Sequence, residues 1–418
     1  MRVRYEIYGC AVMKGEALNA LEELRRKGVE VSEEGGDVAI IFTCTVRSET
    51  EQRMLSRIER LREEHQRVIV TGCLASAQPG LIKKMFPDVS IVSNGQMHKL
   101  YDAVIGKEMY LLGYERPRDW LREPPKGEIL VVPVADGCLG NCTFCITKAA
   151  RPILRSQSPS SIIDYIKKGI EKGAKEIWLT APDLAAYGRD IGITLVDLLD
   201  KVLRTIPEDV KIRIGMMNPD TFEEIMDELM ELMSDKRVYK FFHLPLQSGS
   251  NRMLKLMGRK YTYEQYREIV EKVRRKFVDP TIATDILIGF PGEEEEDFQL
   301  TLKAIREMAF ERVHMAAYTP RPLTIGARMR QVREDVKSKR VKIAYSLMMK
   351  VGEEVHKRYL GGIFKARVSE FDEKYSTFVA RLHNYVPVVL KGNLKIGEEA
   401  RVKITDYTFY DLRGEVIR

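Results

Sequence analysis

Residues 137–145 read Gly-Cys-Leu-Gly-Asn-Cys-Thr-Phe-Cys and place Cys138, Cys142 and Cys145 in CxxxCxxC spacing. The apolar run Ile129–Ala135 comes just before them and predicts a buried β-strand. The cysteines therefore begin beyond the C-terminal end of a strand, where barrel enzymes keep their chemistry. Three thiolates on a short loop can bind three irons of a cubane cluster and leave the fourth iron open. An open metal position is what a catalytic site requires.

A structural zinc ion is the alternative ligand for these thiols. Structural zinc sites are usually closed by four ligands, typically a CxxC pair with a distant CxxC or HxxxH pair. Residues 137–145 have neither a neighbouring histidine nor a fourth cysteine. The spacing therefore favours an iron–sulfur cluster over zinc or unliganded thiols.

The other three cysteines are Cys10, Cys44 and Cys73. Each follows a predicted strand, and these strands are Arg2–Tyr8, Asp37–Phe42 and Arg67–Thr71. Loops at the carboxyl ends of parallel strands emerge on one edge of the sheet, so the three thiols are expected to converge. Three separate buried cysteines are the alternative, because free cysteine is among the most buried residue types.

Composition excludes several classes of protein. The chain has 418 residues, of which 44% are hydrophobic, and this is enough for several domains with their own cores. It has no apolar run long enough to span a membrane, and no signal peptide is expected because its first residues lack an apolar core. Cysteines that stop at Cys145 do not match a secreted disulfide scaffold, so a cytoplasmic location is expected. The net charge of +7 permits a polyanionic partner without requiring one.

Alternating strand and helix signals predict an α/β fold with three domains. Residues 1–118 predict a parallel sheet covered by helices such as Gly15–Lys27 and Ser48–Glu63, and the proline-rich stretch Arg116–Gly127 predicts a linker. Residues 127–355 contain six strand candidates and predict an open, partial (β/α)6 barrel. The candidates are Ile129–Ala135, Glu176–Thr180, Lys211–Gly215, Tyr239–His243, Thr281–Ile288 and Arg312–Ala317. A Rossmann-like sheet is the alternative, but no GxGxxG motif follows any of these strands.

The last predicted domain, residues 358–418, follows a basic helical connector at Arg328–Leu360. Its short strands are Ile363–Glu370, Thr377–Leu382, Val386–Leu390, Ala400–Thr405 and Gly414–Arg418, a pattern that predicts a small all-β barrel. Basic residues with interleaved aromatic residues on such a barrel are typical of RNA binding. The candidates for RNA contact are Lys365, Arg367, Arg381 and Lys403.

The cysteine loop resembles that of the radical S-adenosylmethionine superfamily, whose hallmark is CxxxCx(aromatic)C. Phe144 fills the aromatic position, which in the superfamily lies near the adenine of the cofactor. The resemblance implies that S-adenosylmethionine chelates the open iron and is cleaved by an electron from the cluster. The protein's own contribution is then to position the cofactor and exclude water.

The first three cysteines extend this resemblance to the methylthiotransferase family. The stretches 8–10, 43–47 and 71–73 resemble the three cluster loops of that family's N-terminal domain. Two departures concern asparagines: the family usually has one shortly after the first cysteine, where this chain has Ala11-Val12-Met13, and one at the position of Phe42. The resemblance covers the whole chain, with a TRAM-like domain at the end. It implies S-adenosylmethionine and two [4Fe–4S] clusters, one held by Cys10, Cys44 and Cys73 and the other by Cys138, Cys142 and Cys145.

Further residues are candidates for contacts with the cofactor. They are Phe144, Arg151, Arg155, Asp183, Gln247, Ser248, Asp285 and Ile288. Asp183 could hold a ribose hydroxyl or the methionine amine, or could cap the next helix. Arg151 and Arg155 could pair with the carboxylate of the cofactor, or could be solvated charges. For Gln247, Ser248, Asp285 and Ile288 the alternative is a role in the structure of the loops.

The sequence from Gly137 to Arg151 resembles the archaeal and eukaryotic branch that acts on threonylcarbamoyladenosine, apart from Pro152 in place of the usual glycine. The resemblance implies that one cofactor methylates a sulfur on the first cluster. A second is cleaved, and its radical takes hydrogen from C2 of the modified adenosine at position 37. Partners would be tRNA and an electron donor protein, without a membrane; the sequence does not show the oligomeric state. Alternatives are the branches acting on isopentenyladenosine or a ribosomal-protein aspartate, another radical methylase or thiolating enzyme, and a non-enzymatic RNA-binding metalloprotein.

Overall fold

The computed structural model describes residues 1–106 and 109–417, so the last residue of the predicted strand Gly414–Arg418 lies outside the described residues. The chain divides into two compact units. Unit 1 comprises Met1–Ala174, Leu179–Ile206 and Thr319–Ala327, and unit 2 comprises Lys175–Trp178, Pro207–Tyr318 and Arg328–Arg418. Within the described residues, no helix has both the length and the apolar character needed to cross a membrane.

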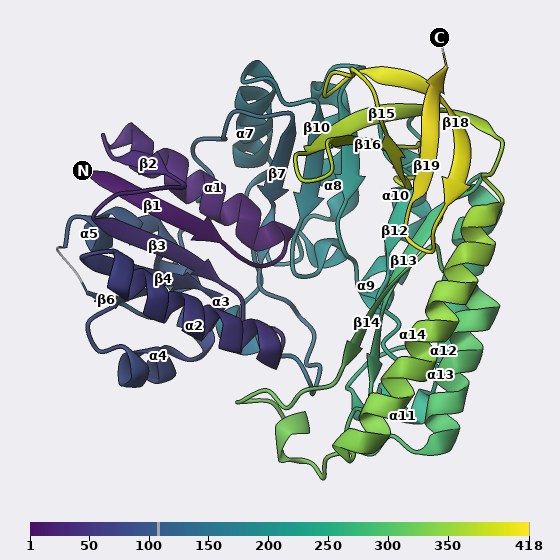
Figure 1. Ribbon diagram of the computed structural model, residues 1–418, viewed down its shortest axis with the longest axis horizontal. Coiled ribbons are helices and arrows are strands. Elements are labelled where there is room, and N and C mark those ends of the chain that lie inside the picture. Colours follow the sequence, from purple (N-terminus) through teal and green to yellow (C-terminus); the bar gives the residue numbers. More distant parts are fainter. Residues whose placement is uncertain (107–108, 418) are drawn as a thin grey trace. The chain divides into compact units, whose positions relative to one another are not determined.

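Unit 1 begins with a parallel sheet in the order β2-β1-β3-β4-β5-β6 (Figure 1). Its strands are β1 (Arg2–Ile7), β2 (Glu30–Ser32), β3 (Val38–Thr43), β4 (Arg67–Gly72), β5 (Ser90–Val92) and β6 (Tyr110–Leu111). Every residue of β3 is buried, as expected for a central strand between two layers of helices. The edge strands β2 and β6 have three and two residues, which is too short for a sequence pattern to predict them.

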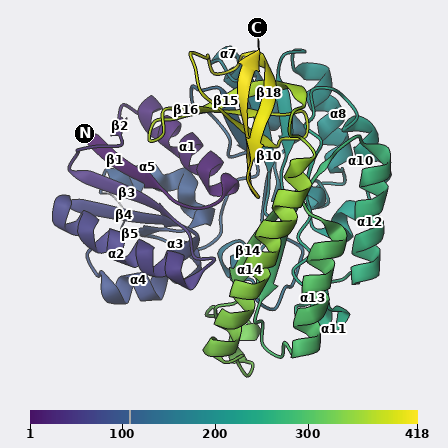
Figure 2. The same cartoon turned by 45° about the vertical axis from the view of Figure 1, so that its right-hand side comes forward.

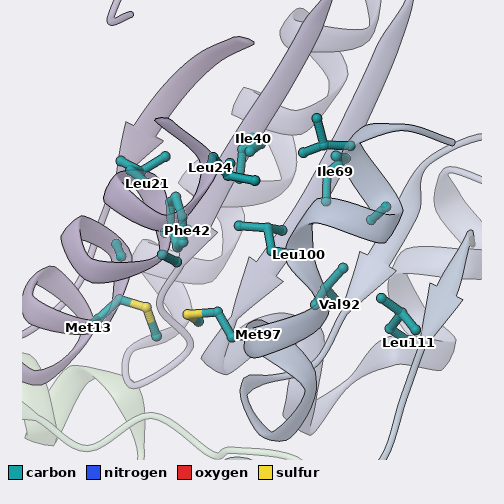
Figure 3. Close-up of a cluster of buried hydrophobic side chains, with 14 of the residues drawn as sticks. Met13, Leu21, Leu24, Ile40, Phe42, Ile69, Val92, Met97, Leu100 and Leu111 are labelled. Atoms are coloured by element: carbon teal, nitrogen blue, oxygen red, sulfur yellow. The ribbon is translucent and has the colours of Figure 1, made fainter. Parts of the chain in front are cut away.

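Helices cover both faces of this sheet, and each face has its own core. The helices are α1 (Ala11–Arg26) and α5 (Leu100–Val104) on one face, with α2 (Ser48–Glu64), α3 (Cys73–Ala77) and α4 (Pro79–Met85) on the other. Successive side chains of β3 alternate, so Ile40 and Phe42 join the first core and Ala39 and Ile41 join the second. Figure 3 shows the first core, where Phe42 packs beside α1. This packing fixes the strand ends from which the loops of Cys10, Cys44 and Cys73 leave.

All six predicted strands of the middle domain are present, and the predicted partial barrel is confirmed. They are β7 (Ile129–Pro133), β10 (Glu176–Thr180), β11 (Lys211–Ile214), β12 (Phe241–His243), β13 (Thr281–Ile288) and β14 (Arg312–Ala317), in the orders β11-β10-β7 and β12-β13-β14. Parallel bridges such as Met216 to His243 connect the end of β11 with β12. The predicted first strand ends early at Pro133, which has no N–H to continue the ladder. A separate strand, β8 (Ala135–Asp136), then pairs with β9 (Arg155–Ser156).

The helices between these strands follow the predicted rhythm. They are α6 (Thr147–Ala150), α7 (Pro159–Glu171), α8 (Leu195–Thr205), α9 (Pro219–Glu223), α10 (Met226–Leu232), α11 (Asn251–Leu256), α12 (Tyr263–Lys276), α13 (Glu295–Met308) and α14 (Glu334–Lys357), with short 3-10 turns η1 (Asn94–Lys99), η2 (Leu184–Ala186) and η3 (Gly326–Arg328). In unit 2, α12, α13 and α14 lie side by side (Figure 2), and Ile305 of α13 packs against Val351 and Val355 of α14. Lys337 and Arg340 of α14 are buried, so this part of the basic connector is not a solvated face.

The C-terminal strands form the predicted small barrel, which is closed in the order β15-β16-β17-β19-β18. They are β15 (Ile363–Asp372), β16 (Thr377–Arg381), β17 (Pro387–Leu390), β18 (Glu399–Tyr407) and β19 (Leu412–Ile417). Tyr385 lies between β16 and β17 and is buried against the middle-domain strands of unit 2. Its ring centroid lies 4.8 Å from that of Tyr239, and its hydroxyl donates to Glu176 at 2.9 Å. The small barrel is thus fixed to the strands of its own unit.

Candidate functional site

The CxxxCxxC loop connects β8 with α6 in unit 1, and the charges of Cys142 and Cys145 act on the Cys138 thiol. Burial raises the pKa of the Cys138 thiol to about 11, with further contributions from the charges of Asp183, Cys142 and Cys145. The backbone N–H of Gly140 donates to Cys138 Sγ at 3.2 Å. A Cβ at position 140 would lie 3.3 Å from that sulfur, so the backbone passes close to the thiol. The loop therefore carries its three sulfur ligands on one short segment.

Cys10, Cys44 and Cys73 also converge, on the edge of the sheet where β1, β3 and β4 end. Burial raises the pKa of the Cys73 thiol to about 11. The charge of Arg151 opposes this rise, and the charges of Cys10 and Cys44 add to it. The pKa of Cys44 is also raised, first by burial and then by repulsion from Cys10. Asn94 Nδ2 lies 3.8 Å from Cys73 Sγ. Since Cys10 is exposed, the alternative of three separate buried cysteines does not describe this arrangement.

The donor sets fit iron–sulfur clusters better than single metal ions. A zinc ion bound at about 2.3 Å draws its sulfur ligands to within about 4 Å of one another. Among the described residues, three ligand atoms lie within 4.8 Å of one another in a trio of two histidines and one aspartate, but in neither cysteine trio. A cubane spreads its thiolates over separate irons and leaves one corner open when only three are supplied. Cluster binding would also displace the thiol protons that burial retains.

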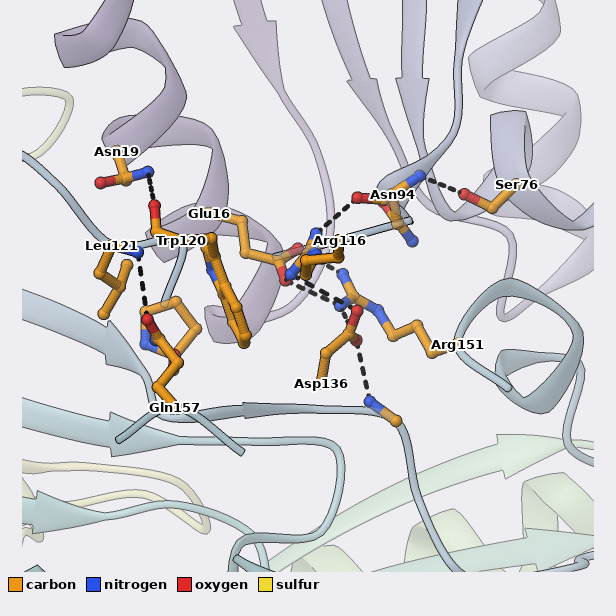
Figure 4. A network of polar contacts seen from close by, with 12 residues as sticks. Glu16, Asn19, Ser76, Asn94, Arg116, Trp120, Leu121, Asp136, Arg151 and Gln157 are labelled. Carbon is orange, nitrogen blue, oxygen red and sulfur yellow. Dashed lines mark hydrogen bonds and ion pairs between the residues drawn. The ribbon is translucent and has the colours of Figure 1, made fainter. Parts of the chain in front are cut away.

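Figure 4 shows a buried network of four charged side chains, Glu16, Arg116, Asp136 and Arg151, in unit 1. Arg151 donates to Glu16 at 2.9 and 2.6 Å and also to Asp136, while Arg116 pairs with Glu16 and lies 3.4 Å from Asp136. All four side chains are at most 2% exposed. Burial would raise the pKa of Asp136, but Arg151 and Arg116 outweigh it and hold that pKa below its usual range. Two carboxylates and two guanidinium groups thus balance in charge.

The positions of these residues in the chain explain what the network does. Glu16 lies in α1, which follows Cys10, and Asp136 lies directly before the CxxxCxxC loop. Arg116 also donates to the carbonyl oxygen of Asn94 at 2.7 Å. Gly137, between Asp136 and Cys138, has φ +77°, and a Cβ there would lie 2.0 Å from a backbone oxygen. The network therefore fixes the loops of both trios to each other, and only glycine fits at the junction.

Arg151 and Arg155 were expected to pair with the cofactor or to be solvated. The solvated alternative is wrong for Arg151, which is 2% exposed and already bound to Glu16 and Asp136. Its charge also lowers the pKa of Cys73. Arg155 is half-buried in β9, opposite Asp136 in the ladder. Pairing of either residue with a cofactor stays a prediction.

Phe144 and Asp183 lie in unit 1 with the cysteine loop. Phe144 is half-buried, between Cys142 and Cys145. Asp183 is fully buried after β10, and its charge raises the pKa of Cys138, so it faces the loop. The alternative of a helix cap is wrong, because the Asp183 side chain makes no capping hydrogen bond to η2. Contact of Phe144 and Asp183 with the cofactor stays a prediction.

The remaining cofactor candidates lie at the ends of β12 and β13 in unit 2. Gln247 has a left-handed φ of +73°, and its N–H donates to the carbonyl oxygen of Asp285 at 2.8 Å. Ser248 is 1% exposed, with its hydroxyl 3.1 Å from that of Thr301, and Ile288 is fully buried. These contacts support the structural alternative for Ser248 and Ile288. Asp285 keeps a partly exposed side chain and is described next.

Three adjacent strands bring His243, Asp285 and His314 together, a constellation that the sequence did not reveal. Asp285 pairs with His314 in the β13–β14 register, and His243 Nε2 lies 3.2 Å from Asp285 Oδ2. The ligand atoms of the three residues all lie within 4.8 Å of one another, close enough to hold one ion. Polar residues at matched positions of β12, β13 and β14 would have predicted this trio. Matching those positions requires the register of the three strands, which the sequence does not give.

His314 is expected to stay neutral far below the usual range of histidine. Burial lowers its pKa to about 4, opposed by Asp285 and assisted by His243, Arg312 and Arg213. As the pH falls, His314 is protonated in the unfolded chain before it is protonated in the folded protein. The folded protein therefore loses stability relative to the unfolded chain as the pH falls from about 6.5 to about 4. A histidine NMR titration, with His314→Asn to assign the resonance, should show no titration of His314 above pH 5. A midpoint near 6.5 would contradict this.

The four RNA-binding candidates divide into two pairs. Lys365 and Lys403 are exposed on the small barrel and stay predictions for RNA contact. Arg367 is 7% exposed and donates to the carbonyl oxygen of Asp209 at 2.7 Å. The Arg381 side chain is 12% exposed and bonds Glu370 at 2.7 Å. The structure thus gives both arginines protein partners, which a periodic sequence pattern cannot show.

Comparisons with known proteins match three separate ranges of the chain to three family models. Residues 2–94 match the Uncharacterized protein family UPF0004, residues 132–305 match the Radical SAM superfamily and residues 357–417 match the TRAM domain. The probable threonylcarbamoyladenosine tRNA methylthiotransferase of Pyrococcus abyssi is 35% identical, over 100% of both chains. The chain belongs to the radical S-adenosylmethionine methylthiotransferase family. It is therefore a transferase that uses radical chemistry, with an iron–sulfur cluster and S-adenosylmethionine.

Relatives outside the archaea agree with this family, and solved structures agree with the fold. The human threonylcarbamoyladenosine tRNA methylthiotransferase is 31% identical, over 98% of this chain and 73% of its own. Among solved structures, the radical methyltransferase TsrM of Kitasatospora setae has a TM-score of 0.57 at 15% identity, covering 78% of this chain and 75% of its own. The cobalamin-dependent enzyme OxsB has a TM-score of 0.54 at 12% identity, covering 83% and 56%. At these identities the two structures support the fold alone.

Proposed function

We propose that this enzyme adds a methylthio group to threonylcarbamoyladenosine at position 37 of tRNA in the cytoplasm, using two [4Fe–4S] clusters. The observation that carries the proposal is the pair of convergent cysteine trios joined by one buried charge network. Each trio offers three thiolates, so each cluster would keep one open corner. A fixed distance between two such corners suits a reaction in which one site supplies sulfur and the other supplies the radical.

The residues of this chain would hold and shield the reacting groups. When bound, the cluster on Cys138, Cys142 and Cys145 supplies the electron that cleaves S-adenosylmethionine, and the cluster on Cys10, Cys44 and Cys73 supplies the sulfur. Asp183 is fully buried beside the cysteine loop and places a carboxylate where a cofactor amine or ribose hydroxyl could bind. Arg151 adds positive charge beside Cys73, which favours an anionic cluster there. Burial of these groups excludes water from the reaction.

The choice of substrate follows from the relatives named for threonylcarbamoyladenosine in archaea and vertebrates. Exposed Lys365 and Lys403 on the TRAM barrel support contact with tRNA phosphates. The proposal also requires an electron donor protein to reduce the clusters. Isopentenyladenosine and the ribosomal-protein aspartate are the competing substrates.

One reaction tests the proposal. Anaerobically reconstituted protein, a chemical reductant and S-adenosylmethionine are incubated with tRNA that carries threonylcarbamoyladenosine, and the nucleosides are analysed by mass spectrometry. The methylthio derivative of that nucleoside is expected. Parallel reactions with isopentenyladenosine tRNA and with the ribosomal protein identify the competing substrates. A product in one of these, and none with threonylcarbamoyladenosine, would contradict the proposed substrate.

A further inference from the structure

Two arginines project from barrel strands of unit 2 without an acidic partner. Arg213 lies in β11, where its neighbours Ile212 and Ile214 are fully buried on the opposite face. Arg312 is the first residue of β14. Neither guanidinium group lies within 4 Å of a carboxylate in the part of the chain that the structure describes, and Arg213 Nε has no hydrogen-bond partner. Both side chains are half-buried and retain partial exposure.

Aromatic rings surround the two guanidinium groups in place of acids. Arg213 lies over the rings of Trp178, Phe241 and Tyr385, at 5.0, 4.7 and 5.2 Å from their centroids. Arg312 lies over Tyr410 at 4.3 Å. Rings of this kind hold a guanidinium plane in place and leave its N–H donors directed to the edge. The rings therefore orient both guanidinium groups; Tyr410 also accepts a hydrogen bond from Arg312, whereas Arg213 Nε has no hydrogen-bond partner.

Glu176 is an acidic group whose charge raises the pKa of Arg213, but by less than burial lowers it. Glu176 accepts hydrogen bonds from Trp178 at 2.5 Å, Tyr239 at 3.2 Å and Tyr385 at 2.9 Å. Arg381 nearby has its own partner, Glu370, and contributes repulsion that lowers the pKa values of Arg213 and Arg312, after the larger effect of burial. Desolvated positive charge without a partner is costly, and an anionic ligand would remove that cost.

We propose that Arg213 and Arg312 bind the carboxylate of the threonylcarbamoyl group and thereby select this substrate. The inference rests on the proposed function and adds the residues that read the modified base. A metal ion on His243, Asp285 and His314 is disfavoured beside these arginines, because two guanidinium groups repel a cation. The threonine part of the modification carries a carboxylate, whereas an isopentenyl group carries no charge. A substrate without the carboxylate would leave both arginines desolvated and unpaired, and such sites discriminate strongly.

A matched pair of RNAs tests the inference by binding. Synthetic anticodon stem–loops carry either threonylcarbamoyladenosine or its methyl ester, so that the phosphates are identical and only the carboxylate differs. Affinity for the cluster-loaded, full-length protein is measured with S-adenosylmethionine present at saturation, which keeps the carboxylate of the cofactor constant. The wild type should bind the acid about tenfold to a hundredfold more tightly than the ester. Arg213→Gln and Arg312→Gln should each bring this ratio close to one, and Arg213→Lys should retain part of it.

Arg204→Gln is the matched control, because Arg204 lies on α8 with its side chain 77% exposed and the substitution removes the same charge. It should leave the ratio of acid to ester affinity unchanged. Equal ratios in the wild type and both glutamine variants would overturn the inference. So would an equal loss of affinity for both RNAs, which would assign the arginines to phosphates or to folding. Methylthiolation of the acid RNA by the wild type is measured in parallel, and its absence would count against the proposed function instead.

Discussion

Replacing Cys142 with alanine should reduce cleavage of S-adenosylmethionine by about three orders of magnitude or more, because groups that act as one unit fail together. Cys142 lies in the CxxxCxxC loop, and its charge contributes to the raised pKa of Cys138. Two thiolates cannot hold a cubane with a single open corner. Formation of 5′-deoxyadenosine by anaerobic protein, measured by chromatography, checks this expectation.

Cys73→Ala is the matched control for this experiment. It removes one thiol from the other trio, so 5′-deoxyadenosine should still form while the methylthio product is lost. The two variants should therefore fail at different steps. Substantial 5′-deoxyadenosine from Cys142→Ala, or its loss in Cys73→Ala with a full complement of iron at the CxxxCxxC loop, would contradict the division of roles between the trios.

Replacing Glu16 with glutamine should lower the free energy of unfolding by about 3–5 kcal/mol, because it leaves a buried positive charge uncompensated. Arg151 and Arg116 both bond the Glu16 carboxylate, and all three side chains are at most 2% exposed. Asp136 alone would then face both guanidinium groups. Denaturant unfolding under anaerobic conditions, followed by circular dichroism, measures the change.

Glu30→Gln provides the comparison for Glu16→Gln. Glu30 pairs with Arg2 at 3.3 Å, but the two side chains are 68% and 51% exposed, so its loss should cost less than about 1 kcal/mol. Each substitution removes one negative charge, so the predicted difference in unfolding free energy comes from the burial of Glu16. Equal effects of the two substitutions would show that the network contributes no more than a surface ion pair.

The sequence predicts the parts of the site that depend on local pattern. The strands before Cys44 and Cys73 are short apolar runs, and the strand before Cys10 alternates polar and apolar residues. Their parallel arrangement brings the following loops to one edge. In the loop at Cys138, the CxxxCxxC spacing is itself visible in the sequence. Local patterns therefore suffice for the strands and the α/β fold, whereas the ligand role of the six thiols stays a prediction.

The polar contacts between distant segments could not be predicted in this way. Arg151 bonds Glu16 across 135 positions, and Arg116 bonds Glu16 across 100. The local sequence around an arginine, after a cysteine loop or in a charged linker, is the same whether its side chain is solvated or buried. Arg213 likewise resembles a solvated strand residue until the register places Trp178 and Phe241 beside it. Tertiary pairing decides these roles.

The iron content of the wild-type protein tests the central claim most directly. Protein reconstituted and purified without oxygen is analysed for iron and acid-labile sulfide per chain. About eight irons and eight sulfides are predicted, since Cys10, Cys44 and Cys73 and the CxxxCxxC loop would each hold one cubane. About four of each would contradict the assignment of a second cluster to the first trio, and none would contradict the account of both.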